Sequence, residues 1–195
     1  MGKRILFLGY SREQTDLISK LEKRNCIVQH KADKMTIAAE KYDLIVSYGY
    51  RHILSQADID AFGAPVINMH ISHLPYNRGA HPNFWAFYED TPHGVTIHEL
   101  DAGIDTGPII FQRPVKFNAD ELSFAMTYAR LVKEIELMFV ENMDAILKGN
   151  WRAVRQQGGG TYHSTGDLPE DVNWAMDIKE YLSARKRPIP QGVWT

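Results

Sequence analysis

The chain has one cysteine among its 195 residues, so it can form no internal disulfide. Cys26 stands beside Ile27 and Val28, a setting typical of a small core residue, and its isolation fits a reducing compartment. Long apolar runs are also missing: Ile5 to Leu8 is too short for a signal peptide or a membrane span. We therefore expect a soluble, cytoplasmic protein that does not contact a membrane.

The sequence has no excess of one charge. Its 22 Lys and Arg residues and 24 Asp and Glu residues give a net charge of −2 and a pI of about 6.4. This balance lacks the broad positive field that non-specific nucleic-acid binding uses, so we expect no nucleic-acid partner. Histidines are frequent between His52 and His98, but only the pair His70 and His73 comes near metal-ligand spacing, and we expect no metal. The turn after Leu8 lacks G-x-G-x-x-G, which disfavours a nicotinamide cofactor.

Short apolar runs alternate with amphipathic stretches along the chain, a pattern typical of an α/β fold. We expect a Rossmann-like, mostly parallel open sheet flanked by helices, with a catalytic domain over residues 1–150 and a C-terminal extension, 151–195, that packs on the core and ends in a mobile tail. The expected strands are 5–8, 26–29, 42–47, 65–69, 95–98 and 109–115. The expected helices are 11–25, 57–62, 82–87, 120–148 and 174–184, with Ser11 and Asn118 as N-terminal caps and Gly149 as a stop.

Three polar residues form the strongest chemical signal. Asn68 and His70 lie where an apolar strand meets its loop, and Asp105 lies in the loop between the next two strands. An amide and an imidazole can stabilise an oxyanion, while a carboxylate can manage a proton. Alone, each has a structural alternative, because Asn residues form turns, Asp-Thr-Gly is a common loop, and the nearby His98 can simply pack. Together they favour an enzyme of acyl transfer.

Four motifs occur in order around these residues: Asn68-Met69-His70-Ile71-Ser72-His73-Leu74-Pro75, Arg78-Gly79-Ala80-His81-Pro82, Gly94-Val95-Thr96-Ile97-His98 and Asp105-Thr106-Gly107. Together they resemble the catalytic core of the formyltransferases that use 10-formyltetrahydrofolate. The resemblance implies an N-formyltransferase in which Asn68 and His70 stabilise the oxyanion. It also implies that Asp105 orients the imidazole and helps to remove the proton of the amine.

The same resemblance implies where the formyl donor binds. The loop after the third expected strand would form part of the pterin pocket, and the segment before Asp105 would form another wall. The implied donor-binding residues are Tyr50, His52, Ile53, Leu54, Asp101, Ala102, Gly103 and Ile104. In that loop, Tyr48 and Arg51 are unusual for the family. Ile53 and Leu54 have a structural alternative as core residues at the start of a helix.

The acceptor is predicted by elimination among the branches of the family. The chain lacks the Gly-Ser-Asn-like phosphate loop of glycinamide ribonucleotide formyltransferases, and too few residues follow Lys148 for the C-terminal barrel of methionyl-tRNA formyltransferases. The remaining branch formylates the amino group of a nucleotide-linked sugar. Its diphosphate and sugar would contact Tyr10, Ser11, Arg12, Tyr76, Asn77 and Arg78. The alternative makes Arg12 a solvated helix residue and 77–79 a plain turn.

Three other functions stay open at this stage: a formyltetrahydrofolate hydrolase, a glycinamide-ribonucleotide-type enzyme and a non-catalytic folate-binding module. A homodimer is also open. Met138, Phe139, Met143 and Trp151 are candidates for a subunit contact, but the same residues can complete the core of one chain.

Overall fold

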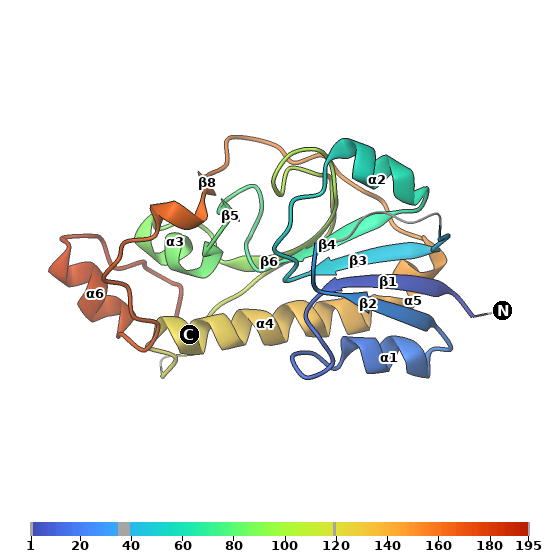
Figure 1. The fold of residues 1–195 in the computed structure, drawn as a ribbon. Coiled ribbons are helices and arrows are strands. Elements are labelled where there is room, and N and C mark those ends of the chain that lie inside the picture. Colours follow the sequence, from blue (N-terminus) through green and yellow to red (C-terminus); the bar gives the residue numbers. More distant parts are fainter. Residues whose placement is uncertain (1, 35–39, 119, 195) are drawn as a thin grey trace.

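A computed structural model describes residues 2–34, 40–118 and 120–194. Within this part of the chain, a six-stranded sheet has the order β2-β1-β3-β4-β6-β7 (Figure 1). β1 (Arg4–Gly9), β2 (Ile27–Lys31), β3 (Leu44–Tyr48) and β4 (Val66–His70) are parallel. β6 (Gly94–Glu99) and β7 (Ile109–Pro114) join antiparallel. The predicted fold class is confirmed.

Helices cover both faces of the sheet. α1 (Leu17–Lys23) and α4 (Phe124–Glu141) lie below the sheet in Figure 1, with α5 (Met143–Lys148) following α4, and α2 (Gln56–Phe62) lies above it. The remaining elements are α3 (Pro82–Tyr88), α6 (Ile178–Ala184), the 3-10 turn η1 (Thr165–Asp167), and the short strands β5 (Arg78–Gly79) and β8 (Tyr162–His163), which pair with each other. None of the helices in the described ranges combines the length and apolarity needed to cross a membrane.

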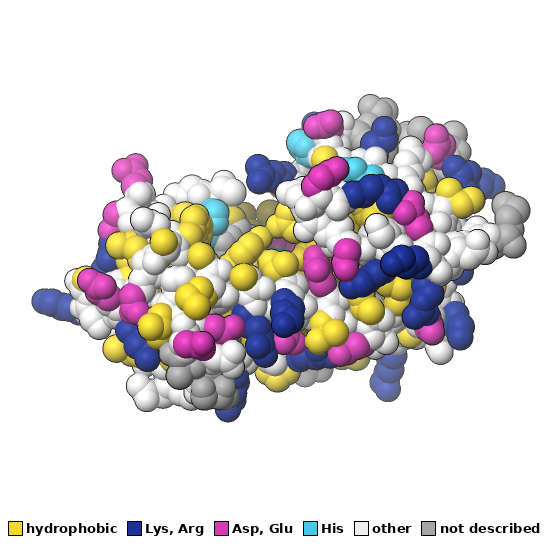
Figure 2. All heavy atoms as spheres, turned by 90° about the horizontal axis from the view of Figure 1, so that it is seen from below, with side chains coloured by type: hydrophobic (Ala, Val, Ile, Leu, Met, Phe, Trp, Pro, Cys, Tyr) yellow, Lys and Arg dark blue, Asp and Glu magenta, His cyan; other side chains and the backbone are white. Residues whose placement is uncertain are grey.

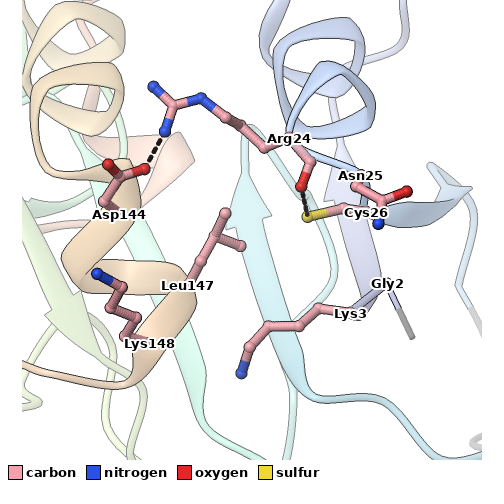
Figure 3. Close-up of a pocket in the computed structure, with 8 residues that line it drawn as sticks. All are labelled: Gly2, Lys3, Arg24, Asn25, Cys26, Asp144, Leu147 and Lys148. Carbon is pink, nitrogen blue, oxygen red and sulfur yellow. Dashed lines mark hydrogen bonds and ion pairs between the residues drawn. The ribbon is translucent and has the colours of Figure 1, made fainter.

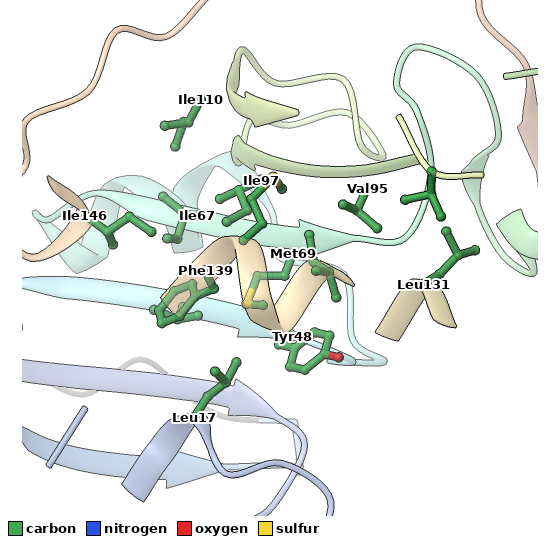
Figure 4. Packing of buried hydrophobic residues seen from close by; sticks show 14 of the residues in the cluster. Leu17, Tyr48, Ile67, Met69, Val95, Ile97, Ile110, Leu131, Phe139 and Ile146 are labelled. Carbon is green, nitrogen blue, oxygen red and sulfur yellow. The ribbon is translucent and has the colours of Figure 1, made fainter. Parts of the chain in front are cut away.

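The core has two parts, one on each face of the sheet. The larger lies toward α1 and α4, where Met69, Ile97 and Phe139 pack together (Figure 4). The smaller lies under α2 and contains Phe62 and Val66. Because side chains alternate between the faces of a strand, Ile67 and Met69 point to the larger core and Asn68 and His70 point to the α2 face. The alternation of β4 thus sets the face on which the polar residues gather.

Three predicted helix starts are wrong. The helix expected from 174 begins at Ile178, after Asp177, whose side chain accepts from the Glu180 N–H and caps it. The helix expected from Ser11 begins at Leu17, because Ser11 directs its hydroxyl to Glu13 while its N–H binds the Gln14 side chain, and the segment forms a turn. The long helix expected from 120 begins after Ser123, whose hydroxyl accepts from the Met126 N–H at 3.2 Å, so Ser123 and not Asn118 is its cap.

The long helix also has a break that the sequence did not predict. α4 ends before Asn142, whose side-chain amide donates to the Met138 carbonyl at 2.8 Å, and α5 continues to Lys148. Gly149 ends α5 with φ 67°, as predicted.

The proposed subunit-contact residues belong mainly to the core of this chain. Met138, Phe139 and Met143 are buried, and Trp151 donates from Nε1 to Glu99 Oε1 at 2.9 Å. The core alternative therefore accounts for the first three. The described end of the extension also contacts the core, since the Phe117 N–H binds the Val193 carbonyl at 2.8 Å; Thr195 lies outside the described residues.

Candidate active site

The Asp105 carboxylate is the centre of a buried polar cluster. Its Oδ1 accepts from Asn68 Nδ2 at 3.0 Å, and its Oδ2 accepts from the Gly79 N–H at 2.9 Å. His70 Nδ1 lies 3.5 Å from Oδ2. The structure thus brings together the three residues predicted to be catalytic, from β4 and from the loop between β6 and β7.

His98 is a fourth member of this cluster. In the antiparallel pairing of β4 and β6 it lies directly opposite Asn68, so both side chains leave the same face of the sheet. Its Nε2 is 3.3 Å from Asp105 Oδ1 and 3.2 Å from Asn68 Nδ2. His98 is fully buried, but it does more than pack, because its imidazole contacts both Asp105 and Asn68.

Backbone carbonyls fix one proton on each of the two histidines. His70 Nε2 faces the Asn77 carbonyl at 2.9 Å, and His98 Nδ1 faces the Glu99 carbonyl at 2.8 Å. Since a carbonyl only accepts, those nitrogens must carry hydrogen. His98 Nε2 can accept from Asn68 when it carries no hydrogen, or donate to Asp105 when it does, whereas among the described residues Asp105 is the partner of His70 Nδ1. The geometry therefore suits an imidazolium at His70 beside an ionised Asp105.

The environment of Asp105 contains opposing electrostatic effects. Burial by itself would raise the pKa of this carboxyl, which is only 9% exposed. The charge of His70, the bond from His98 and the Gly79 N–H outweigh burial and hold the pKa of Asp105 well below its usual range. The carboxylate therefore stays ionised at neutral pH, as an acceptor of protons must be.

The two segments predicted to bind the donor both adjoin the smaller core. Tyr50 and Leu54, after β3, and Leu100, after β6, pack against the same smaller core. Tyr50 and His52 meet edge to face with ring centres 5.2 Å apart, whereas Ile53 is 75% exposed. The core alternative thus fits Leu54 but not Ile53.

The loop before Asp105 is braced by Asp101. Its Oδ1 accepts from the Gly103 N–H at 3.0 Å and from Thr106 Oγ1 at 2.5 Å. Ala102, Gly103 and Ile104 are exposed in the same loop. The loop therefore combines a fixed base with an exposed outer edge.

The residues predicted to bind the acceptor are in different situations. Tyr10 Oη lies 2.9 Å from Tyr128 Oη on α4, and its ring meets Tyr48 edge to face. Ser11 binds Glu13, and both terminal nitrogens of Arg12 lie 2.7 Å from the Glu22 carboxylate. Of these three residues, Tyr10 alone has its polar group paired with a residue more than a hundred positions away in the sequence.

The second predicted acceptor segment, 76–78, is held from within the protein. Asn77 is fully buried with φ 58°, and its amide donates to Thr91 Oγ1 at 2.8 Å. Tyr76 is half-buried, and its carbonyl accepts from Ser72. Arg78 donates to Gln156 Oε1, at 2.7 Å from Nη2. The Asn77 side chain therefore holds its loop in place.

The sequence did not predict that two residues of the C-terminal extension, Gln156 and Thr161, contact the site. Gln156 bonds the carbonyls of Asp105 and Gly107, and Thr161 bonds Asn77. These partners are 49–84 positions apart in the chain, and no local pattern reports such contacts.

The surface of the molecule has a hollow and a separate small pocket. The face seen in Figure 2 is hollowed between the part that carries α6 and the part that carries α1, and hydrophobic side chains border much of the hollow. A separate pocket of about 280 Å³ lies between the N-terminal ends of β1 and β2 and the helix α5 (Figure 3). It is lined by Gly2, Lys3, Arg24, Asn25, Cys26, Asp144, Leu147 and Lys148. There Arg24 is paired with Asp144. In the described ranges, no group of His, Cys, Asp and Glu side chains is arranged to hold a metal ion.

Comparison with known proteins agrees with this geometry. The structure of the formyltransferase PseJ from Anoxybacillus kamchatkensis, in complex with UDP-4,6-dideoxy-4-formamido-L-AltNAc and tetrahydrofolate, superposes with a TM-score of 0.83 and 39% identity, covering 91% of this chain and 96% of that one. A 4-N formyltransferase from Francisella tularensis shares the fold at a TM-score of 0.72 and 24% identity, over 95% of this chain and 89% of that one.

Curated sequences give the same result. A dTDP-4-amino-4,6-dideoxyglucose formyltransferase of Mycobacterium tuberculosis (strain H37Rv) is 35% identical over 122 residues, which are 63% of this chain and 51% of the relative. The chain spans about half the length of the curated relatives it matches. The family model described as formyl transferase matches residues 11–142, which include Asn68, His70, His98 and Asp105. The chain therefore belongs to the formyl transferase family.

Proposed function

We propose that the protein transfers the formyl group of 10-formyltetrahydrofolate to the amino group of a nucleotide-linked amino sugar. The observation that carries this proposal is the cluster of Asn68, His70 and Asp105 in a chain that is 39% identical to PseJ over nearly the whole of PseJ. PseJ was crystallised with a 4-formamido sugar on UDP, and the mycobacterial relatives are named for a 4-amino-4,6-dideoxy sugar on dTDP. The acceptor class common to both is a 4-amino-4,6-dideoxyhexose on a pyrimidine nucleoside diphosphate.

The cluster suits each step of this transfer. The amine attacks the formyl carbon, a C–N bond forms, and the carbonyl oxygen becomes an oxyanion. Asn68 gives one amide hydrogen to Asp105, and its second faces His98 Nε2. When His98 Nε2 carries hydrogen and donates to Asp105 instead, this second hydrogen is free to stabilise that oxygen together with His70, the nearby cation. Asp105, held ionised, accepts the proton that the amine loses. Cleavage of the bond to N10 then releases tetrahydrofolate, with N10 taking up a proton.

The formyl donor would bind between the loop after β3 and the loop before Asp105. Tyr50, His52, Ile53 and Leu54 come from the first loop, and Asp101, Ala102, Gly103 and Ile104 from the second. Packing of Tyr50, Leu54 and Leu100, which precedes the second loop, on the smaller core supports this site. The exposed Ile53 is suited to contact a pterin ring, because removing a large apolar side chain from water is favourable. No metal enters this chemistry.

The acceptor would lie on the side of Tyr10. Ser11 and Arg12 are already paired with carboxylates, and we propose Arg51 instead as the cation for the diphosphate. Arg51 is exposed, follows β3, and has no ion pair in the described part of the chain. It also acts electrostatically on Tyr128, the partner of Tyr10. Tyr76 and Arg78, in the segment after Leu74-Pro75, would contact the sugar.

One incubation tests this proposal against its alternatives. The purified protein receives 10-formyltetrahydrofolate with UDP- and dTDP-linked 4-amino-4,6-dideoxyhexoses, with glycinamide ribonucleotide, or with no acceptor. Tetrahydrofolate release and acceptor mass are followed together. A formylated amino sugar supports the proposal, whereas release without an acceptor identifies a hydrolase, and folate binding without release identifies a binding module. The homodimer and the cytoplasmic location stay predictions.

A further inference from the structure

The chain returns to the active site after the segment that defines the family. The family match ends at residue 142, whereas Gln156 Nε2 donates to the carbonyls of Asp105 and Gly107, both at 2.8 Å. Gln156 Oε1 accepts from Arg78 Nε at 3.2 Å and Nη2 at 2.7 Å. One side-chain amide thus uses both hydrogens and both acceptor positions to connect two loops of the site.

The two loops connected by Gln156 are the ones that define the geometry of Asp105. The backbone of Asp105 has φ 51°, in the left-handed region that non-glycine residues adopt at a cost. Gly107 leaves no room for adjustment, since an added Cβ would lie 1.8 Å from the Glu99 carbonyl oxygen. On the other side, Arg78 precedes Gly79, whose N–H binds the Asp105 carboxylate. Gln156 therefore holds the backbone that carries the carboxylate and the residue next to one of its donors.

The segment around Gln156 is itself anchored. Thr161 accepts the Asn77 N–H at its hydroxyl and the Arg78 N–H at its carbonyl, at 2.8 and 3.0 Å. The His163 carbonyl accepts the Ala80 N–H at 2.8 Å, and its ring stacks on Trp85 with centres 3.8 Å apart. Residues 156–163, the return segment, are therefore fixed against the loop that they contact.

We propose that Gln156 is a positioning residue, which holds the backbone of Asp105 and the Arg78–Gly79 segment so that the carboxylate keeps its place between Asn68 and His70. The inference rests on the proposed function for its kinetic consequence. It assigns to the return segment a part in the active site that the family match does not include.

The variant Gln156→Glu keeps the bonds from Arg78 but removes the bonds to the carbonyls of Asp105 and Gly107. A glutamate still accepts from Arg78, but as a carboxylate it faces the carbonyls of Asp105 and Gly107 with no hydrogen to donate. We expect kcat at neutral pH to fall roughly 10- to 100-fold, because small misplacements of a catalytic group have effects of that order. KM for donor and acceptor should change less than about twofold. As the pH falls, the protonated glutamate can donate again, so kcat relative to the unmodified protein should rise.

Gln157→Glu is the matched control. Gln157 is the exposed neighbour of Gln156, so the same change of charge in the same segment should leave kcat and its pH profile as they were. Hydrogen–deuterium exchange over residues 99–108, measured without substrates, gives a reading that does not depend on turnover. We expect roughly tenfold faster exchange there in Gln156→Glu and no change in Gln157→Glu.

The outcomes separate this inference from the proposed function. An unchanged kcat and unchanged exchange in Gln156→Glu overturn the inference, as does a raised KM with unchanged kcat. If the unmodified protein formylates no amine, the proposed function fails, and the exchange over 99–108 alone decides the role of Gln156.

Discussion

The carboxyl ends of β4 and β1 carry similar sequence signals but differ in the structure. At the end of β4, Asn68 and His70 meet a carboxylate that comes from a loop more than thirty positions away. After β1, Ser11 and Arg12 meet Glu13 and Glu22 of their own neighbourhood. A polar residue at a strand end is thus a strong candidate for a functional role when its partner lies far away in the sequence. It is a weak candidate when an oppositely charged or hydrogen-bonding neighbour in the sequence already pairs with it.

The largest effect is expected for Asp105→Asn, which removes the proton acceptor at the centre of the cluster. We expect kcat to fall roughly 10²–10⁴-fold, the usual contribution of such a group. Asp90→Asn is a suitable control, because Asp90 is an exposed aspartate that also has a positive φ, 54°. Steady-state kinetics with an amino-sugar acceptor measure both variants. A loss of less than twofold in Asp105→Asn would contradict the proton role.

Asn68→Ala is expected to have the next largest effect, because it removes one oxyanion donor. The typical cost of about 2.7–4 kcal/mol corresponds to roughly 10²–10³ in kcat. Asn118→Ala, at a site outside the cluster, controls for the loss of an amide side chain. If single-turnover rates of Asn68→Ala matched those of the unmodified protein, the oxyanion would have to be stabilised elsewhere.

The two arginines near β1 and β3 test the comparison directly. Arg51→Gln should raise the KM for the acceptor roughly 10-fold or more, since a charge-assisted bond contributes about 1.5–3 kcal/mol, and should leave the donor KM unchanged. Arg12→Gln should change neither value, because Glu22 already binds its guanidinium. The opposite result, with Arg12 essential and Arg51 dispensable, would place the diphosphate at the end of β1.

The smallest effect concerns stability against pH. The pKa of Asp105 is lower in the folded protein than in the unfolded chain, where it is about 3.9. Its stabilising contribution is therefore complete above that value and is lost as the pH falls toward the folded pKa. Urea unfolding from pH 8 to pH 3 should show a constant difference in the free energy of unfolding between the unmodified protein and Asp105→Asn above about pH 5, and a smaller difference below pH 4. A difference that grows on acidification would contradict the lowered pKa.

The sequence predicted the elements that depend on local pattern. Apolar runs marked β1, β3 and β4, and the ordered set of Asn68, His70 and Asp105 identified the site because several residue types had to occur together. Helix starts were less predictable: a serine before an apolar stretch can cap a helix, as Ser123 does, or bind a neighbouring carboxylate, as Ser11 does.

Tertiary contacts account for what the sequence could not predict. Nothing around Gln156 indicates that it bonds the Asp105 loop, because the contact depends on where the return segment passes. Asn77 was expected at the acceptor as part of the segment 76–78 after Leu74-Pro75, yet its left-handed backbone turns the side chain toward Thr91 and the interior.

The proposed function and the role of Asp105 are tested most directly by measuring formyl transfer to UDP- and dTDP-linked 4-amino-4,6-dideoxyhexoses by the unmodified protein and by Asp105→Asn. Tetrahydrofolate release and acceptor mass are recorded in the same reaction. We expect the unmodified protein to release tetrahydrofolate only with an acceptor, which gains one formyl group, and Asp105→Asn to be at least about 10²-fold slower. Release that is independent of any acceptor, or equal in the two proteins, would contradict this expectation.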